Sequence, residues 1–342
     1  MEQVKQIHQC AHIVDAHFDL LMDVEIQRGY GRKKVIETDY LPKFREGGVN
    51  TVVAAIYIDN QFVPEMSLRK ALNQIQALYA EMDESPEVIS LCRSVADIQK
   101  AEEEGKIGFI LSLEGAEPLY RDVNLLRIFY ELGLRKLGFV WSRRNDAGDG
   151  SDFILGRKRK QGGLSDFGFE LIEKAEELGI VLDVTHLNDE GFWDVMEAAR
   201  HPVIASHSNC RSICPSPRNL SDDQIKAIAE KGGVIGINAV SFVVADTDEQ
   251  ANVDGLLAHM DHIKRLVGIE HMGLGLDLCE DFMKYIAPET LAQIPRKPFD
   301  VIKGHGEIPK ITEALLKHGY KESDIEQILG GNWLRVYREV WK

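Results

Sequence analysis

The sequence predicts an α/β fold of the (β/α)8 barrel class with extra C-terminal helices. Eight short apolar runs alternate with segments whose apolar residues recur at helical spacing. Several of these runs end in a histidine or a carboxylate, as strands do at the carboxyl face of such a barrel. An open doubly wound sheet is the alternative, but it usually has fewer strands and a glycine-rich first turn, which Gly29-Tyr30-Gly31 does not match.

The first half of the chain supplies four of the predicted strands. These apolar runs lie at 13–17, 50–58, 107–113 and 135–141. A short lead-in helix is predicted at 2–12 and a longer helix at 67–82, where the apolar residues follow a helical period. The polar stretch after residue 141 is predicted to be a loop.

The second half supplies the other four strands. Their ranges are 180–184, 202–205, 233–240 and 271–277. Helices are predicted at 165–178, 191–201, 221–231 and 254–267, with Ser221 as a helix N-cap. Residues 309–342 add further helices. Because no repeat or low-complexity linker interrupts the pattern, we expect residues 1–342 to form one domain.

Composition excludes several classes of partner. The formal net charge is −15 and 28% of the 342 residues are charged. Nucleic acids and anionic membranes select basic surfaces, so neither is expected as a partner. The one basic run, 157–160, lies beside glycines and is predicted to be a solvated loop. With 44% hydrophobic residues, the chain can bury a large core.

Cysteines and chain ends indicate a cytoplasmic location. Five cysteines in a chain of this length do not form a disulfide framework, and we expect reduced thiols. Cys210 and Cys214 lack a second pair that would complete a metal site. The N-terminal stretch has no apolar signal core, and no run approaches the ~20 apolar residues of a membrane span. The C-terminal stretch has no cleavable hydrophobic tail.

Two histidines stand at equivalent places in the predicted barrel. His186 follows the fifth strand and His207 follows the sixth. Because these strands are predicted to be parallel neighbours, both side chains are expected at the carboxyl edge, where they could share a metal ion. Taken singly, each histidine could equally be a polar strand-end residue bonded to a loop.

Four further residues are predicted to reach the same edge. His17 and Asp19 are two apart at the end of the first strand, Glu114 closes the third, and Asp277 closes the eighth. The six side chains are too many for one tetrahedral zinc with an open position. They suit two metal ions bridged by a carboxylate, an arrangement used for hydrolysis.

At this point the sequence resembles the membrane (renal) dipeptidases, peptidase family M19 of the amidohydrolase superfamily. The motifs that carry the resemblance span most of the chain: His17-x-Asp19, Ser112-Leu-Glu114-Gly115, Gly163-Leu-Ser-x-x-Gly168, Leu182-Asp-Val-Thr-His186, Ser206-His-Ser208, Arg218-Asn219, Gly275-Leu-Asp277 and Gly331-Asn-Trp-Leu-Arg335. The resemblance implies two Zn²⁺ ions per chain. By it, His17 and Asp19 bind one ion, His186 and His207 bind the other, and Glu114 bridges them.

The resemblance also assigns the remaining site residues. Asp277 matches the catalytic acid and base of the family, and Arg218 matches a substrate-binding arginine. The family often has a substrate-contacting histidine after the fourth strand, in a Leu-Thr-His pattern. Here that position is Trp141, with Asn145 nearby as a second predicted substrate contact. The residues after Asp277 also depart from the family's usual Asp-Phe-Asp-Gly.

The sequence therefore predicts a zinc-dependent dipeptidase that cleaves small dipeptides through a metal-bridging hydroxide. The resemblance further implies tolerance of a D-residue at the second position and a homodimer. Trp141 favours an alternative, a binuclear amidohydrolase acting on an N-acyl amino acid or a lactam. A non-catalytic binding protein on the same fold is a third possibility, and loss of a metal ligand would favour it.

Overall fold

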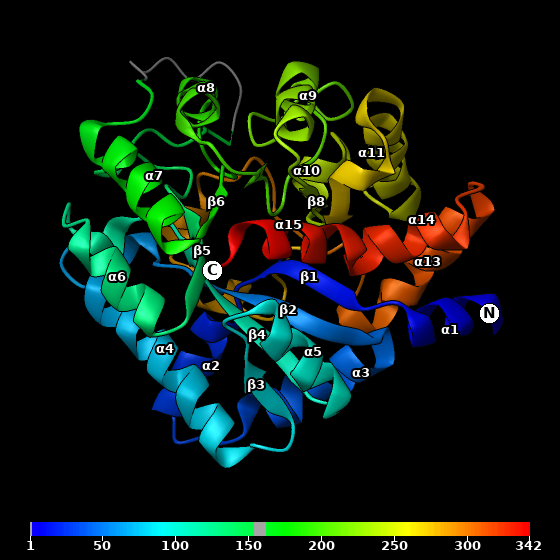
Figure 1. Cartoon of the computed structure of the whole chain (residues 1–342), viewed down its shortest axis with the longest axis horizontal. Coiled ribbons are helices and arrows are strands. Elements are labelled where there is room, and N and C mark those ends of the chain that lie inside the picture. Colours follow the sequence, from blue (N-terminus) through cyan, green and yellow to red (C-terminus); the bar gives the residue numbers. More distant parts are fainter. Residues whose placement is uncertain (1, 154–161) are drawn as a thin grey trace.

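The structure, a computed structural model, describes residues 2–153 and 162–342. Nine parallel strands form its sheet, in the order β7-β6-β5-β4-β2-β1-β9-β8, with β3 added outside β4. A parallel bridge between Ala205 and Ile235 links the two ends of this order. Helices surround the sheet (Figure 1), and the predicted (β/α)8 barrel is confirmed. The predicted basic loop at 157–160 lies outside the described residues.

The strands are short and almost entirely buried. They are β1 (Ile13–Phe18), β2 (Val49–Ile56), β3 (Ile89–Leu91), β4 (Ile107–Glu114), β5 (Leu134–Gly138), β6 (Val181–Asp183), β7 (Val203–Ile204), β8 (Ile235–Ile237) and β9 (Met272–Leu274). Most of their residues are β-branched or otherwise apolar, which suits strands covered on both faces.

The helices follow the strands along the chain. They are α1 (Glu2–Cys10), α2 (Leu20–Gly29), α3 (Leu41–Gly47), α4 (Ser67–Glu84), α5 (Val95–Glu103), α6 (Asn124–Glu131), α7 (Asp166–Leu178), α8 (Asp189–Ala198), α9 (Asp222–Glu230), α10 (Ser241–Val244), α11 (Val253–Val267), α12 (Pro288–Leu291), α13 (Ile308–Lys317), α14 (Glu322–Glu326) and α15 (Asn332–Val340). The predicted N-cap Ser221 is confirmed: its hydroxyl accepts the amide of Gln224, whose side chain accepts the amide of Ser221. None of the helices in the described part of the chain combines the length and apolar character of a membrane span.

All eight predicted strands form, and the predicted ranges differ from the structure at their ends. The fourth was predicted to reach Trp141, but β5 ends at Gly138. Phe139 and Val140 are fully buried although they have left the sheet. An apolar sequence pattern reports burial, so it cannot separate a strand from a buried rim loop. The short β3 was not predicted, because three residues carry too little pattern.

The last helix closes the barrel at the end opposite the candidate site. Trp333 on α15 is fully buried, and its indole Nε1 donates to the carbonyl of Leu274 on β9 at 3.0 Å. It packs with Val14, Val53 and Ile110 from three barrel strands. Figure 1 shows α15 lying across the strands. The carboxyl ends of the strands are left to hold functional side chains.

Candidate metal centre

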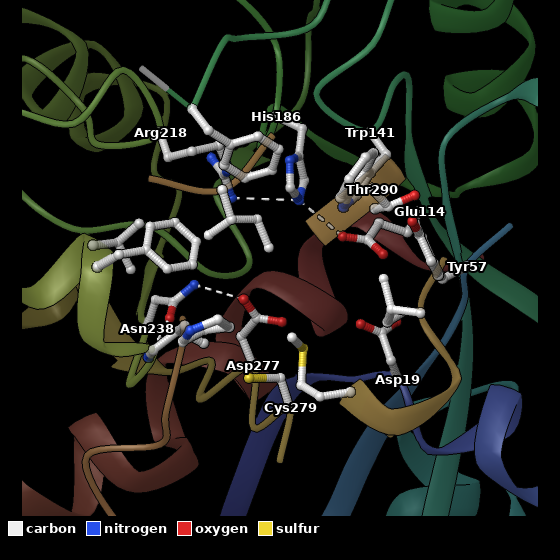
Figure 2. A pocket seen from close by; sticks show the side chains of 18 of the residues that line it. Asp19, Tyr57, Glu114, Trp141, His186, Arg218, Asn238, Asp277, Cys279 and Thr290 are labelled. Atoms are coloured by element: carbon white, nitrogen blue, oxygen red, sulfur yellow. Dashed lines mark hydrogen bonds and ion pairs between the residues drawn. The ribbon is translucent and has the colours of Figure 1, made fainter. Parts of the chain in front are cut away.

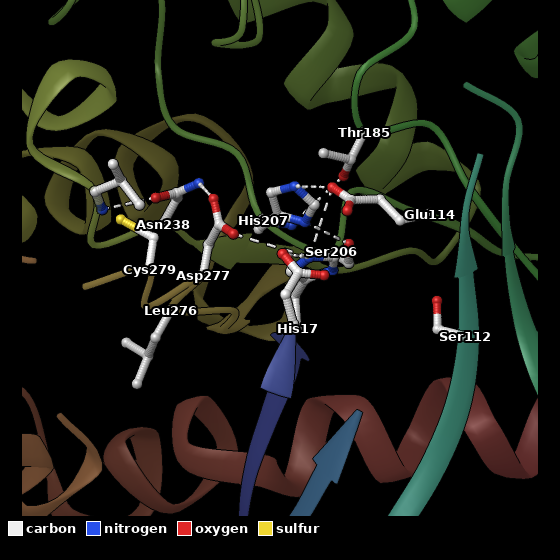
Figure 3. A network of polar contacts seen from close by, with 12 residues as sticks. His17, Ser112, Glu114, Thr185, Ser206, His207, Asn238, Leu276, Asp277 and Cys279 are labelled. Atoms are coloured by element: carbon white, nitrogen blue, oxygen red, sulfur yellow. Dashed lines mark hydrogen bonds and ion pairs between the residues drawn. The ribbon is translucent and has the colours of Figure 1, made fainter. Parts of the chain in front are cut away.

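The carboxyl ends of the barrel strands bring the predicted ligands together. His17 belongs to β1, Glu114 is the last residue of β4, and the other four lie just beyond their strands. Figure 3 shows His17, Glu114, His207 and Asp277 pointing toward one another. Five of the six predicted residues are buried, and the Asp277 side chain is 21% exposed.

Glu114 lies at the centre of the group. Its Oε1 atom is 2.8 Å from Nε2 of His186 and 3.6 Å from Nε2 of both His17 and His207. Two sets of possible ligand atoms share His17. One contains His17, Glu114 and His207, and the other contains His17, Asp19 and Asp277. The structure therefore brings His17 close to His207 as well as to Asp19, so the two predicted ion positions adjoin each other.

The polar atoms of this group fit bound cations. Both ring nitrogens of His17, Oδ1 of Asp19 and Oε2 of Glu114 are buried without a hydrogen-bond partner in the described part of the chain. Burial raises the pKa of Glu114 well above its ordinary value, and Asp19 and Asp277 add to the rise. Buried carboxylates that lack partners are costly unless a cation compensates them. Imidazole and carboxylate donors are those that zinc accepts in proteins.

Two of the histidines are held in the neutral form that binds metal. Burial lowers the pKa of His186 and of His207 well below the ordinary value, and nearby positive groups lower both further. Nδ1 of His186 lies 2.8 Å from the hydroxyl of Ser142, and Nδ1 of His207 lies 2.9 Å from the hydroxyl of Ser206. With the proton on Nδ1 in each ring, both Nε2 lone pairs face the centre.

A buried ion pair fixes the His207 ring. The Ser206 hydroxyl donates its proton to Oδ2 of Asp183 at 2.5 Å, so toward Nδ1 of His207 the Ser206 oxygen can act only as an acceptor. Asp183 in turn accepts from Nζ of Lys136 at 2.8 Å. Burial would raise the pKa of Asp183, but Lys136 and the Ser206 hydrogen bonds outweigh it and bring the pKa to about 2. The charged pair thus orients a proposed ligand from beneath.

Asp277 is placed differently from the carboxylates around it. Its Oδ2 accepts from Nδ2 of Asn238 at 2.8 Å, while Oδ1 lies 3.8 Å from Nε2 of His17. Burial raises the pKa of Asp277 to about 7, although His17 opposes the rise. Its backbone φ is +54°, and that of His186 is +71°. Such left-handed conformations cost non-glycine residues roughly 1–2 kcal/mol and cluster at functional sites.

Arg218 and Trp141 border the cavity beside this centre. Arg218 is 5% exposed, and its Nη2 donates to Nε2 of His186 at 3.3 Å. Burial lowers the pKa of its guanidinium to about 10. The indole ring of Trp141 lies 5.8 Å from the His186 ring, centroid to centroid. Figure 2 shows Arg218 and Trp141 on different sides of His186.

The structure does not bring Asn145 into the cavity with the other predicted site residues. Its Nδ2 donates to the carbonyl of Phe139 at 2.8 Å, and its Oδ1 accepts from the amide of Ala147 at 2.8 Å. Both ends of the amide therefore hold the loop that follows β5. Among the described residues, those that line the cavity do not include Asn145.

Among the lining residues that the sequence analysis missed, two stand directly after barrel strands. Tyr57 directly follows β2, and Asn238 directly follows β8. Both stand at strand ends, the position that identified the predicted ligands. The signal was available, but neither side chain is an ordinary metal ligand, so a search for ligands passed over them.

Comparison with known proteins reveals the relatives of this chain. The model of the family "Membrane dipeptidase (Peptidase family M19)" matches residues 1–342. An uncharacterized protein of the pqqA 5′ region in Klebsiella pneumoniae is 31% identical over 258 residues, which cover 74% of this chain and 90% of that protein. Dipeptidase 3 of Rattus norvegicus is 29% identical over 301 residues, covering 88% of this chain. That match spans only 58% of the rat protein's own length.

Solved structures agree over nearly the whole chain. A metallo peptidase from Rhodobacter sphaeroides, liganded with a phosphinate mimic of the dipeptide L-Ala-D-Ala, superposes with a TM-score of 0.84 and 26% identity. The dipeptidase AC, a metallo peptidase of family M19, gives a TM-score of 0.84 and 28% identity. Each comparison covers 97% of this chain and 99% of the other.

Proposed function

The chain belongs to the membrane dipeptidase family, peptidase family M19, and is a metallo-dipeptidase; we propose that it hydrolyses small dipeptides with two zinc ions. The observation that carries the proposal is the convergence of unpartnered buried nitrogen and carboxylate atoms at one rim of the barrel. His17 and Asp19 would hold one ion, His186 and His207 the other, and Glu114 would bridge them.

When bound, the ions would lower the pKa of a water molecule toward neutrality and would polarise the scissile carbonyl. The residues of the chain do the rest. Arg218 binds the terminal carboxylate of the substrate, a planar partner for its guanidinium. Asp277 accepts the proton of the attacking water at a carboxylate oxygen and returns it to the leaving amine. Asn238 holds that carboxylate in place through its 2.8 Å hydrogen bond.

We further propose that a D-residue is tolerated at the second position of the substrate. The Rhodobacter sphaeroides relative carries a mimic of L-Ala-D-Ala, and its fold covers 97% of this chain. Because Arg218 would bind only the terminal carboxylate, the configuration of the residue that bears it is left to the cavity walls. Hydrolysis assays of L-Ala-L-Ala and L-Ala-D-Ala under the same conditions test this tolerance.

A second function keeps the metal centre and changes the substrate to an N-acyl amino acid or a lactam. The buried Trp141 ring beside His186 favours it, because an acyl chain lacks the charge of a free amino group. A panel of dipeptides, N-acetyl amino acids and lactams, tested on zinc-loaded protein, separates the two. Dipeptide hydrolysis at least tenfold faster than that of the matched N-acetyl compounds supports the dipeptidase, and the reverse order supports the alternative.

A further inference from the structure

A row of aromatic rings borders the cavity beside the metal centre. We call it the aromatic arc and define it as Tyr57, Trp141, Phe153 and Phe242. Consecutive ring centroids are 5.2 Å, 5.4 Å and 5.9 Å apart, within the usual range for packed aromatic side chains. Tyr57, Trp141 and Phe153 are each at most 9% exposed, so the arc is part of a packed wall. Figure 2 shows Trp141 above the proposed metal ligands Glu114 and Asp19, and Tyr57 to their right.

The rest of the cavity wall is also mainly apolar. The segment after β9 contributes Phe282, Met283, Ile286, Ile294 and Pro298. Among the described lining residues, the carboxylates all belong to the proposed metal centre: Asp19, Glu114 and Asp277. Arg218 is the one arginine or lysine among these described lining residues. A charged substrate side chain packed against the apolar part of this wall would lose hydration without gaining a partner there, which is costly. An apolar side chain would instead gain from leaving water.

Trp141 is held in place from behind. The Arg143 guanidinium lies 5.3 Å from the Trp141 ring centroid, within the range of a cation–π contact. Arg143 donates to Oε1 of Glu117 at 2.8 Å and to the carbonyl of Ile58 at 2.8 Å. Its charge is therefore paired with Glu117 and is not presented to the cavity. A wall fixed in this way is preorganised, so it recognises a ligand side chain without first being ordered.

The positions of Arg218 and Trp141 relate the wall to one end of a substrate. Both contact His186, Arg218 through Nη2 at 3.3 Å and Trp141 through its ring. Figure 2 shows Arg218 and Trp141 on different sides of His186, so a dipeptide bound by its carboxylate at Arg218 and extended past His186 would place its amino-terminal residue toward Trp141. Resting on the proposed dipeptidase function, we propose that the aromatic arc selects dipeptides with an apolar amino-terminal side chain, and that Trp141 determines this specificity.

A substrate series tests the proposal on the zinc-loaded wild-type protein. The probes are Gly-Ala, Leu-Ala, Phe-Ala, Glu-Ala and Lys-Ala, which differ only in the amino-terminal side chain. We expect kcat/KM for Leu-Ala and Phe-Ala to exceed that for Gly-Ala by at least about tenfold, because an apolar pocket discriminates by about that factor. Glu-Ala and Lys-Ala should fall below Gly-Ala. Equal values across the series, or a preference for a charged side chain, would overturn the inference.

Variants then assign the preference to one residue. Trp141→Ala should reduce the ratio of kcat/KM for Phe-Ala to that for Gly-Ala by about tenfold. Trp141→Leu keeps an apolar side chain and should reduce this ratio less. It provides the test if the alanine variant fails to fold. Trp193→Ala is the matched control, because Trp193 on α8 is 44% exposed and does not line the cavity. An unchanged ratio in both Trp141 variants would remove Trp141 from specificity.

The failure of this inference differs from the failure of the proposed function. Hydrolysis of the whole series without an apolar preference would leave the dipeptidase intact and overturn the specificity. Hydrolysis of none of the five dipeptides by protein that holds two zinc ions would overturn both.

Discussion

The Nε2 atoms of His186 and His207 lie 3.0 Å apart, and each ring has a serine hydroxyl within hydrogen-bond distance of its Nδ1 atom. With the proton of each neutral ring on Nδ1, both Nε2 atoms present lone pairs. Two lone pairs that face each other at this distance repel unless a proton or a cation lies between them. Burial lowers the pKa of both rings, which argues against the extra proton of an imidazolium at this point. The pair is therefore arranged for a cation, and Oε1 of Glu114, 2.8 Å from His186, faces the same point.

Replacement of Glu114 tests the bridging role. Glu114→Gln keeps the size of the side chain and removes the charge that lies among three histidines, so zinc occupancy should fall at both positions together. His207→Ala should lower zinc occupancy chiefly at one of the two positions. Elemental analysis after dialysis against a set concentration of free zinc measures both variants. Two equivalents of zinc in Glu114→Gln, held at wild-type affinity, would show that Glu114 does not bridge.

Arg218 should act on substrate binding. Because its proposed partner is the substrate carboxylate, Arg218→Met should raise KM strongly for free dipeptides and much less for C-terminally amidated ones. Steady-state kinetics on the two substrates, with zinc content checked in the same preparation, gives the comparison. An equal rise in KM for both substrates contradicts the assignment, as does no rise at all.

His259 should make the fold sensitive to acid. Its Nδ1 accepts from the amide of Cys210 at 3.1 Å, and its Nε2 faces the carbonyl of Val244 at 2.8 Å, so only the neutral ring satisfies both. Burial lowers its pKa from 6.5 to about 4. Between these values the unfolded chain binds more protons than the folded one. The stabilisation is thus complete above about pH 6.5 and is lost as the pH falls toward 4.

The size of this effect follows from the shift. The fall of the His259 pKa from 6.5 to about 4 corresponds to roughly 3 kcal/mol of unfolding free energy. His259→Gln can make both hydrogen bonds without titrating, so it should lose less stability than the wild type between pH 7 and pH 4.5. Denaturant unfolding of both proteins in the presence of a chelator measures the difference. Parallel loss of stability in the two proteins would refute the prediction.

How far the sequence predicts this site depends on the kind of contact. The rule that parallel strands end at one edge was enough to gather His17, Glu114 and His207, because it requires only strand order. The role of Asn145 could not be predicted in this way, since it depends on how the loop after β5 turns back on Phe139. The ion pair between Lys136 and Asp183 could not be predicted either, because neither strand alone determines the register between β5 and β6.

Asp277 distinguishes proton transfer from metal binding. Asp277→Asn preserves shape but cannot accept a proton, so kcat should fall by roughly 10²–10⁴-fold while zinc content stays at two equivalents. The matched control is Asp281→Asn, because that side chain is 48% exposed and pairs with Lys43 at the surface. Loss of zinc from Asp277→Asn would make Asp277 a ligand. Near-normal kcat with full zinc would exclude it from the mechanism.

Zinc titration of the metal-free protein tests the central claim most directly. The protein is stripped of metal, zinc is added in known equivalents, and the initial rate of L-Ala-L-Ala hydrolysis is followed. The account predicts no hydrolysis without metal and a rate that reaches its plateau at two equivalents per chain. Hydrolysis by the stripped protein, a plateau at one equivalent, or no hydrolysis by protein that holds two zinc ions would contradict it.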